Sequence, residues 1–190
     1  PEDGIVTCQD CGKEFDYDQS KWRLTCQDCG DQRDRSNKTA SLRDNRERNR
    51  DIWAAFVPPL YDDTDIHHDE FNKSLWDKVK DWDWKDGQGL GLAGEKGSSK
   101  TRIAYLLLQK RCMESCRVDA IGAHAFVKLS QGQYRNNGEN GFCGKQITWQ
   151  SASLLLVDGL DRVTNWSNRT EDDLAALLEY RYKRKRPVIW

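Results

Sequence analysis

The sequence lacks a long apolar run, a clear excess of charge of one sign and any abundance of proline. No stretch approaches the ~18 consecutive apolar residues of a membrane span, so we expect no membrane association. The 30 Lys and Arg residues nearly balance the 31 Asp and Glu residues, which excludes a uniformly basic nucleic-acid coat. Four prolines and 14 glycines among 190 residues exclude a collagen-like chain.

What is present suffices for a folded core, because the chain holds eight tryptophans and several aliphatic runs. At roughly 150 residues per domain, its length predicts one domain, or one domain with a small appendage. Shifts in composition predict three parts: a metal module at 1–30, an arginine-rich linker or helix at 31–60 and an α/β core at 61–190.

Two Cys-x2-Cys pairs near the N-terminus predict a zinc ribbon. Structural zinc takes four nitrogen or sulfur ligands in a tetrahedron, and each pair supplies two of them. A glycine follows each pair, at Gly12 and Gly30, where a knuckle turn needs a positive φ. The alternative is a set of redox pairs or unrelated buried thiols. The predicted ligands are Cys8, Cys11, Cys26 and Cys29.

The role of this zinc is predicted to be structural or interactive, because four protein ligands leave no open position for water. Four zinc thiolates also require a reducing compartment, so we expect the protein in the cytoplasm.

An octet beginning at Gly94 matches the phosphate-loop pattern G-x-x-x-x-G-K-[ST] except at Ser99, where glycine is usual. A short apolar strand (89–93) precedes it and a helix follows, so backbone N–H groups would surround phosphate at a helix N-terminus. Lys100 would reach the β- and γ-phosphates, and the Thr101 hydroxyl would bind Mg²⁺. The predicted nucleotide-binding residues are Gly94, Glu95, Lys96, Gly97, Ser98, Ser99, Lys100, Thr101 and Arg102.

The serine in this octet is the main departure from the pattern. If the position demands a positive φ, serine costs roughly 1–2 kcal/mol relative to glycine. The alternative is a Gly/Ser-rich loop that carries Lys-Thr by chance.

A second motif, a strand that ends in an acidic residue, supports the prediction of a phosphate loop. Four aliphatic residues end in Asp158, which predicts a buried parallel strand with a carboxylate at the edge where α/β proteins bind ligands. Asp158 would complete the Mg²⁺ shell beside Thr101. Gly159 stands where many proteins with this core carry an acid that orients the attacking water. Asp161 is therefore the tentative catalytic residue, and a plain loop or salt-bridge role is the alternative.

The rest of the second half alternates helices and strands, which predicts a parallel sheet. The expected elements are a helix at 101–114, a strand at 118–123, a loop at 130–145, a strand at 154–157, a helix at 170–181 and a strand at 187–190.

Three segments, 91–104, 154–161 and 177–190, resemble the AAA+ ATPases of the DnaC/DnaI/IstB type, the helicase loaders and their phage and transposon relatives. The resemblance implies a three-layer P-loop core that binds ATP or ADP with Mg²⁺, with the last strand between the phosphate-loop strand and the Asp158 strand. It implies a bacterial or phage-encoded homo-oligomer whose partner is a replicative helicase or another replication or transposition protein. It further implies that a sensor, an arginine finger and a helical lid follow Trp190.

The end of the sequence carries five cations in six residues. They are candidates for contact with DNA phosphates, single-stranded DNA included, while a solvated helix end whose cations favour the dipole is the alternative. The candidates are Arg181, Lys183, Arg184, Lys185 and Arg186.

The sequence thus predicts an ATP-binding replication accessory protein, and in particular a helicase loader. Three alternatives remain open: a transposition-helper ATPase, a nucleotide-gated adaptor that does not hydrolyse ATP, and a zinc-dependent DNA- or protein-binding module with a degenerate ATPase core.

Overall fold

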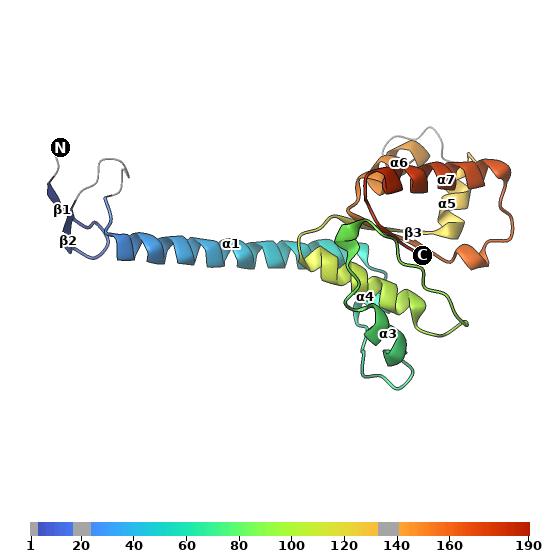
Figure 1. Ribbon diagram of the computed structural model, residues 1–190, viewed down its shortest axis with the longest axis horizontal. Helices are drawn as coiled ribbons and strands as arrows, with labels where there is room; N and C mark the ends of the chain where they lie inside the picture. The colour runs from blue at the N-terminus through green and yellow to red at the C-terminus, as the bar shows by residue number, and fades with distance from the viewer. Residues whose placement is uncertain (1–3, 17–23, 133–140) are drawn as a thin grey trace. The chain divides into compact units, whose positions relative to one another are not determined.

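The computed structural model describes residues 4–16, 24–132 and 141–190, and the chain forms two compact units, Pro1–Arg48 and Asn49–Trp190 (Figure 1). Helix α1 (Gln27–Phe56) begins inside the predicted metal module and passes residue 30 without a break. The predicted three-part division stays a prediction, and its first part includes residues 17–23, which lie outside the described residues.

The first unit combines a small hairpin with the larger part of α1. Strand β1 (Ile5–Thr7) pairs antiparallel with β2 (Glu14–Asp16), in a register that sets Val6 opposite Phe15. From residue 31 to 48 every residue of α1 is exposed. The sequence explains this, because that segment has no apolar stripe that would bury one face of the helix.

The second unit is built on a parallel three-stranded sheet of order β3–β4–β5. The register sets Ile121 opposite Val157 and Leu156 opposite Ile189. On the far side of β5, Leu90 forms a parallel bridge to Ile189. The predicted strand 89–93 is therefore present only as this bridge, and the last strand lies between it and β4 as the resemblance implied. The strands are β3 (Val118–Gly122), β4 (Leu154–Asp158) and β5 (Val188–Ile189).

Helices cover both faces of this sheet, which gives three layers (Figure 1). One face packs against α4 and the residues 53–79, and the other against α5, α6 and α7. Successive residues of β4 alternate between the faces, as a doubly covered parallel strand requires. The helices are α2 (Pro59–Asp62), α3 (Lys73–Val79), α4 (Lys100–Met113), α5 (Ala123–Ser130), α6 (Phe142–Ser151) and α7 (Asn168–Lys183), with short 3-10 turns η2 (Trp84–Asp86) and η4 (Leu160–Arg162).

Apart from the strand at 89–93, the helices and strands predicted for the core begin and end within two residues of the expected positions. Helices α5 and α6 were missed. Half of the predicted loop at 130–145 lies outside the described residues, and its last four residues belong to α6. In the described part of the chain, none of the helices is long and apolar enough to cross a membrane.

Arg181 joins α7 to the end of α6 and to the residue that precedes β5. Its side chain is fully buried and donates hydrogen bonds to the carbonyls of Trp149, Ala152 (2.9 Å) and Pro187 (2.7 Å). Burial lowers the pKa of Arg181 to about 10, which still leaves the guanidinium charged at neutral pH. The prediction that Arg181 contacts DNA phosphates is therefore wrong, because the side chain is fully buried and donates to three carbonyls of the core.

We expect Arg181→Met to lower the free energy of unfolding by about 3 kcal/mol or more, because three buried carbonyls lose a charged donor. Lys183→Met, at an exposed position of the same helix, is the matched control and should stay within about 0.5 kcal/mol of the wild type. Urea unfolding followed by tryptophan fluorescence measures both. Equal unfolding midpoints for the two variants would contradict the role of Arg181.

Candidate functional site

The phosphate-loop octet folds as a tight turn that leads into α4. Gly94 and Gly97 have φ values of 146° and 87°, a region that glycine enters without strain. Lys100 is the first residue of α4, and its ammonium donates hydrogen bonds to the carbonyls of Gly94 (2.7 Å) and Glu95 (2.6 Å). The cation is thus held at the mouth of the loop, beside the N-terminus of a 14-residue helix that favours an anion.

Ser99 takes a left-handed conformation, with φ 61° and ψ 11°, so the position does demand the positive φ considered for it from the sequence. The hydroxyl accepts a long hydrogen bond from the Asn72 backbone N–H and donates one to the Glu70 carbonyl, each at 3.3 Å. The serine therefore carries the strain expected of a residue with a side chain, and it joins the phosphate loop to the segment that precedes α3.

The next residue of α4 contacts the acidic end of β4. The Thr101 hydroxyl donates a hydrogen bond of 3.0 Å to Oδ1 of Asp158. One turn further along α4, burial raises the pKa of Tyr105 to about 12, with a smaller contribution from the negative charge of Asp158. The neutral Tyr105 ring stacks on Tyr61, with ring centroids 4.6 Å apart. The two motifs that the sequence predicted to meet are therefore in direct contact.

Thr101, Asp158 and most of the phosphate loop line a pocket of about 860 Å³. Pockets of roughly 300–1,000 Å³ commonly hold small molecules and cofactors. All the predicted nucleotide-binding residues except Glu95 line it, and so do Asp158 and Asp161. Glu95 contributes its carbonyl to Lys100 instead. The nucleotide roles of these residues stay predictions, although the structure brings them together.

Asp161 lies in the turn η4, three residues after the end of β4. Its side chain is exposed at the pocket wall. The intervening Gly159 has φ 76°, so the chain reverses direction directly after Asp158. The catalytic role of Asp161 stays a prediction.

Part of the pocket wall was missed from the sequence. It comes from the segment 60–71 and from the last residues of the chain. The Leu60 carbonyl accepts a hydrogen bond from Arg102 at 3.4 Å, and Trp190 packs so closely over Gly89 and Gly91 that a Cβ at either position would collide with its indole or approach it tightly. No local motif marks these positions, although the crowding of glycines before the phosphate loop was a usable signal.

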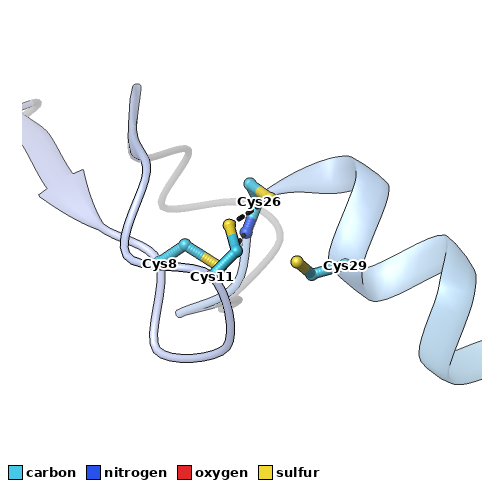
Figure 2. Close-up of side chains that lie close together, drawn as sticks. All are labelled: Cys8, Cys11, Cys26 and Cys29. Atoms are coloured by element: carbon cyan, nitrogen blue, oxygen red, sulfur yellow. Dashed lines mark hydrogen bonds between the residues drawn. The ribbon is translucent and has the colours of Figure 1, made fainter.

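The second candidate site is the cysteine cluster of the first unit (Figure 2). The four sulfur atoms predicted as ligands all lie within 4.8 Å of one another. The Sγ atoms of Cys11 and Cys26 are 3.6 Å apart, close to the roughly 3.8 Å edge of a tetrahedron with 2.3 Å zinc–sulfur bonds. The Cys26 backbone N–H donates to Sγ of Cys8 at 3.3 Å. The positions of these four sulfur atoms are compatible with a zinc ion bound between them.

Electrostatics also favour a cation in this cluster. The backbone N–H of Cys26 lowers the pKa of Cys8 to about 6, so one thiolate forms readily. The pKa of Cys29 is raised well above its usual range by the neighbouring sulfurs of Cys11 and Cys26. Four thiolates at this separation repel one another, and a divalent ion at their centre removes that repulsion.

The two halves of the cluster differ in structure. Gly12 has the expected positive φ of 73°, and its N–H bonds to the Cys8 carbonyl at 2.9 Å. Gly30 was predicted to match it but has no positive φ, because Cys29 and Gly30 belong to the first turns of α1. The second pair is thus presented by a helix N-terminus.

The remaining DNA candidates lie at the end of α7 and just beyond it. Lys183 pairs with Glu179 at 2.6 Å, and the Arg184 guanidinium lies 3.7 Å from the ring centroid of Tyr180. Lys185 is exposed, and Arg186 donates to the Gln150 carbonyl. Their contact with DNA stays a prediction.

Several solved structures share this fold. The chain is similar to a DNA replication initiation factor (18% identity, TM-score 0.57), to AMPPCP-bound DnaA from Aquifex aeolicus (14%, 0.53) and to a replication initiator DnaA bound to AMPPCP and single-stranded DNA (16%, 0.54). Each match covers 70% of this chain but only 41–42% of the other. Neither a family model nor a curated protein matches the sequence. The chain therefore shares the α/β fold of these structures, with helices on both faces of a parallel sheet, as the sequence predicted.

We expect Cys26→Ser to abolish stoichiometric zinc binding, because a structural site needs its four ligands and the metal contributes to folding. Zinc per chain, measured by elemental analysis of the purified protein, should fall from one to almost none. Cys143→Ser, at an exposed cysteine outside the cluster, is the control and should keep one zinc. Full zinc content in Cys26→Ser would exclude the proposed ligand set.

Ser99 permits a test of the left-handed turn. Ser99→Gly and Ser99→Ala both remove the hydroxyl, but only glycine adopts φ 61° without strain. We expect the glycine variant to be more stable than the alanine variant by about 1 kcal/mol. Urea unfolding measures this difference, and an alanine variant as stable as the glycine variant would show that the turn carries no strain.

Proposed function

We propose that the chain is an ATP-binding accessory protein of DNA replication, and that within this class it acts as a helicase loader. The observation that carries the proposal is the hydrogen bond between Thr101 and Asp158, 3.0 Å long, in the same pocket as Lys100. A hydroxyl and a carboxylate in contact at the edge of a parallel sheet suit Mg²⁺, and a lysine at the N-terminus of α4 suits phosphate.

The chain's own residues have distinct tasks in this proposal. ATP brings phosphate to the loop, and Lys100 exchanges its two carbonyl partners for phosphate oxygens. The backbone N–H groups of the loop bind the same phosphates, while Thr101 and Asp158 orient the Mg²⁺ shell. Zinc at the cysteine cluster would hold the first unit in a shape that a helicase or another replication protein recognises. The solved structures similar to this chain, two of them with bound AMPPCP and one of these also with single-stranded DNA, support a replication role.

A second candidate function is a nucleotide-gated adaptor that binds ATP without hydrolysing it. One observation favours it: the residue after Asp158 is Gly159, and the nearest acid along the chain, Asp161, lies exposed in the following turn. An adaptor would use ATP to set a conformation and would release it unchanged.

We expect wild-type protein to bind a fluorescent ATP analogue in the presence of Mg²⁺. Lys100→Ala should weaken binding at least about tenfold, because a charged hydrogen bond to phosphate contributes roughly 1.5–3 kcal/mol. Asp158→Asn should remove the dependence on Mg²⁺. Lys145→Ala, which changes a lysine on α6 outside the pocket, is the control.

ATP turnover by the same samples separates the two functions. Turnover that Asp161→Ala abolishes supports the ATPase and the role of Asp161, whereas binding without turnover supports the adaptor. Failure of the wild type to bind ATP, with one zinc per chain, would refute both and leave a zinc-based interaction module.

A further inference from the structure

The end of α7 and the residues after it form a cationic and aromatic surface, which we call the α7 terminus and define as residues 180–186. Because Arg181 is buried in the core, this surface carries fewer exposed cations than the five that the sequence places at 181–186. The exposed cations are Lys183, Arg184 and Lys185, and one aromatic ring, Tyr182, stands among them.

Tyr182 is the unusual member of the α7 terminus. It is 79% exposed, whereas Tyr105 in the same unit is 8% exposed. A phenol ring normally buries most of its area, so a ring left in water is available to a flat partner. Leu178, one turn earlier on α7, is 37% exposed.

The cations around this ring differ in availability. Lys183 is paired with Glu179 and is partly neutralised. The Arg184 guanidinium rests on the Tyr180 ring, which holds its plane while leaving one side accessible. Lys185 is exposed at a left-handed residue with φ 52°, where the chain turns back toward β5. Within the described residues, Arg184 and Lys185 are therefore the exposed cations of the α7 terminus that make no ion pair.

The α7 terminus is held rigidly, so little ordering is needed when a ligand binds. The backbone N–H groups of Arg184 and Arg186 bond to the Arg181 carbonyl, and that of Lys185 bonds to the Tyr182 carbonyl, each at 3.0 Å. Arg186 is fixed by the Gln150 carbonyl, and the next residue, Pro187, is buried.

We propose that the α7 terminus binds single-stranded nucleic acid, with a base stacked on Tyr182 and phosphates at Arg184 and Lys185. A ring flanked by cations matches a polymer that alternates flat bases with negative phosphates. An unpaired base offers its face to Tyr182, whereas a duplex keeps that face inside its stack. The proposal deepens the replication role and rests on it for its biological meaning, but the binding chemistry is independent of the nucleotide pocket.

The test uses the full zinc-loaded chain and fluorescence anisotropy with a fluorescein-labelled oligothymidylate. We expect Tyr182→Ala to weaken binding at least about fivefold, with the slope of affinity against salt unchanged, because it removes stacking but no charge. Tyr182→Phe should keep binding within about twofold. Arg184→Gln with Lys185→Gln should reduce the salt slope by about 1.4, which is 0.7 for each lost phosphate contact.

Leu178→Ala and Lys183→Gln are the matched controls on the same helix, and we expect much smaller effects from both. Circular dichroism of every variant shows whether it is folded. ATP-analogue binding separates the two proposals, because failure of the wild type to bind ATP refutes the proposed function but not nucleic-acid binding at the α7 terminus. Binding by Tyr182→Ala equal to the wild type, equal affinity for the annealed duplex, or equal displacement by polyglutamate would overturn the proposal.

Discussion

The contact between the Thr101 hydroxyl and the Asp158 carboxylate fixes the place in the second unit where the pocket forms. It joins the first turn of α4 to the carboxyl end of β4, so the phosphate loop and the acidic strand share one edge of the sheet. The parallel register of β4 with β5 fixes this edge, since Leu156 opposite Ile189 places Asp158 beside the end of the chain. Side chains of α4 pack on Leu154 and Leu156, which keeps the helix start at that height. The packing of α4 on the sheet therefore brings the phosphate loop and Asp158 together at one side of the pocket.

Much of this arrangement could be predicted because it depends on local sequence. The glycines and Lys100 of the octet, and four aliphatic residues before Asp158, are continuous motifs whose conformation is set by neighbouring residues. The motif also identified Ser99 as the position where a positive φ would strain a side chain, and the structure has φ 61° there. The cysteine cluster followed from spacing alone, because a tetrahedral ion imposes a nearly fixed geometry on two pairs.

What could not be predicted depends on contacts between distant residues. Arg181 belongs to a run of cations that reads as a solvated helix end, and only its three carbonyl partners, 6 to 32 residues away, explain its burial. The pocket wall at 60–71 contacts the phosphate loop through the Ser99 hydroxyl, a pairing that no sequence pattern encodes. Gly30 was misjudged because the start of α1 at Gln27 had not been located, and a helical residue has no need of a positive φ.

The position after Asp158 shows how the backbone limits the chemistry of the pocket. A Cβ at Gly159 would meet only the Arg162 side chain, at an ordinary 3.5 Å, so space does not exclude a larger residue there. The obstacle is the backbone, because φ 76° is a region where a glutamate would be strained by roughly 1–2 kcal/mol. The backbone therefore favours glycine over an acid directly after Asp158, and the next acid along the chain, Asp161, lies in the turn beyond, at the pocket wall.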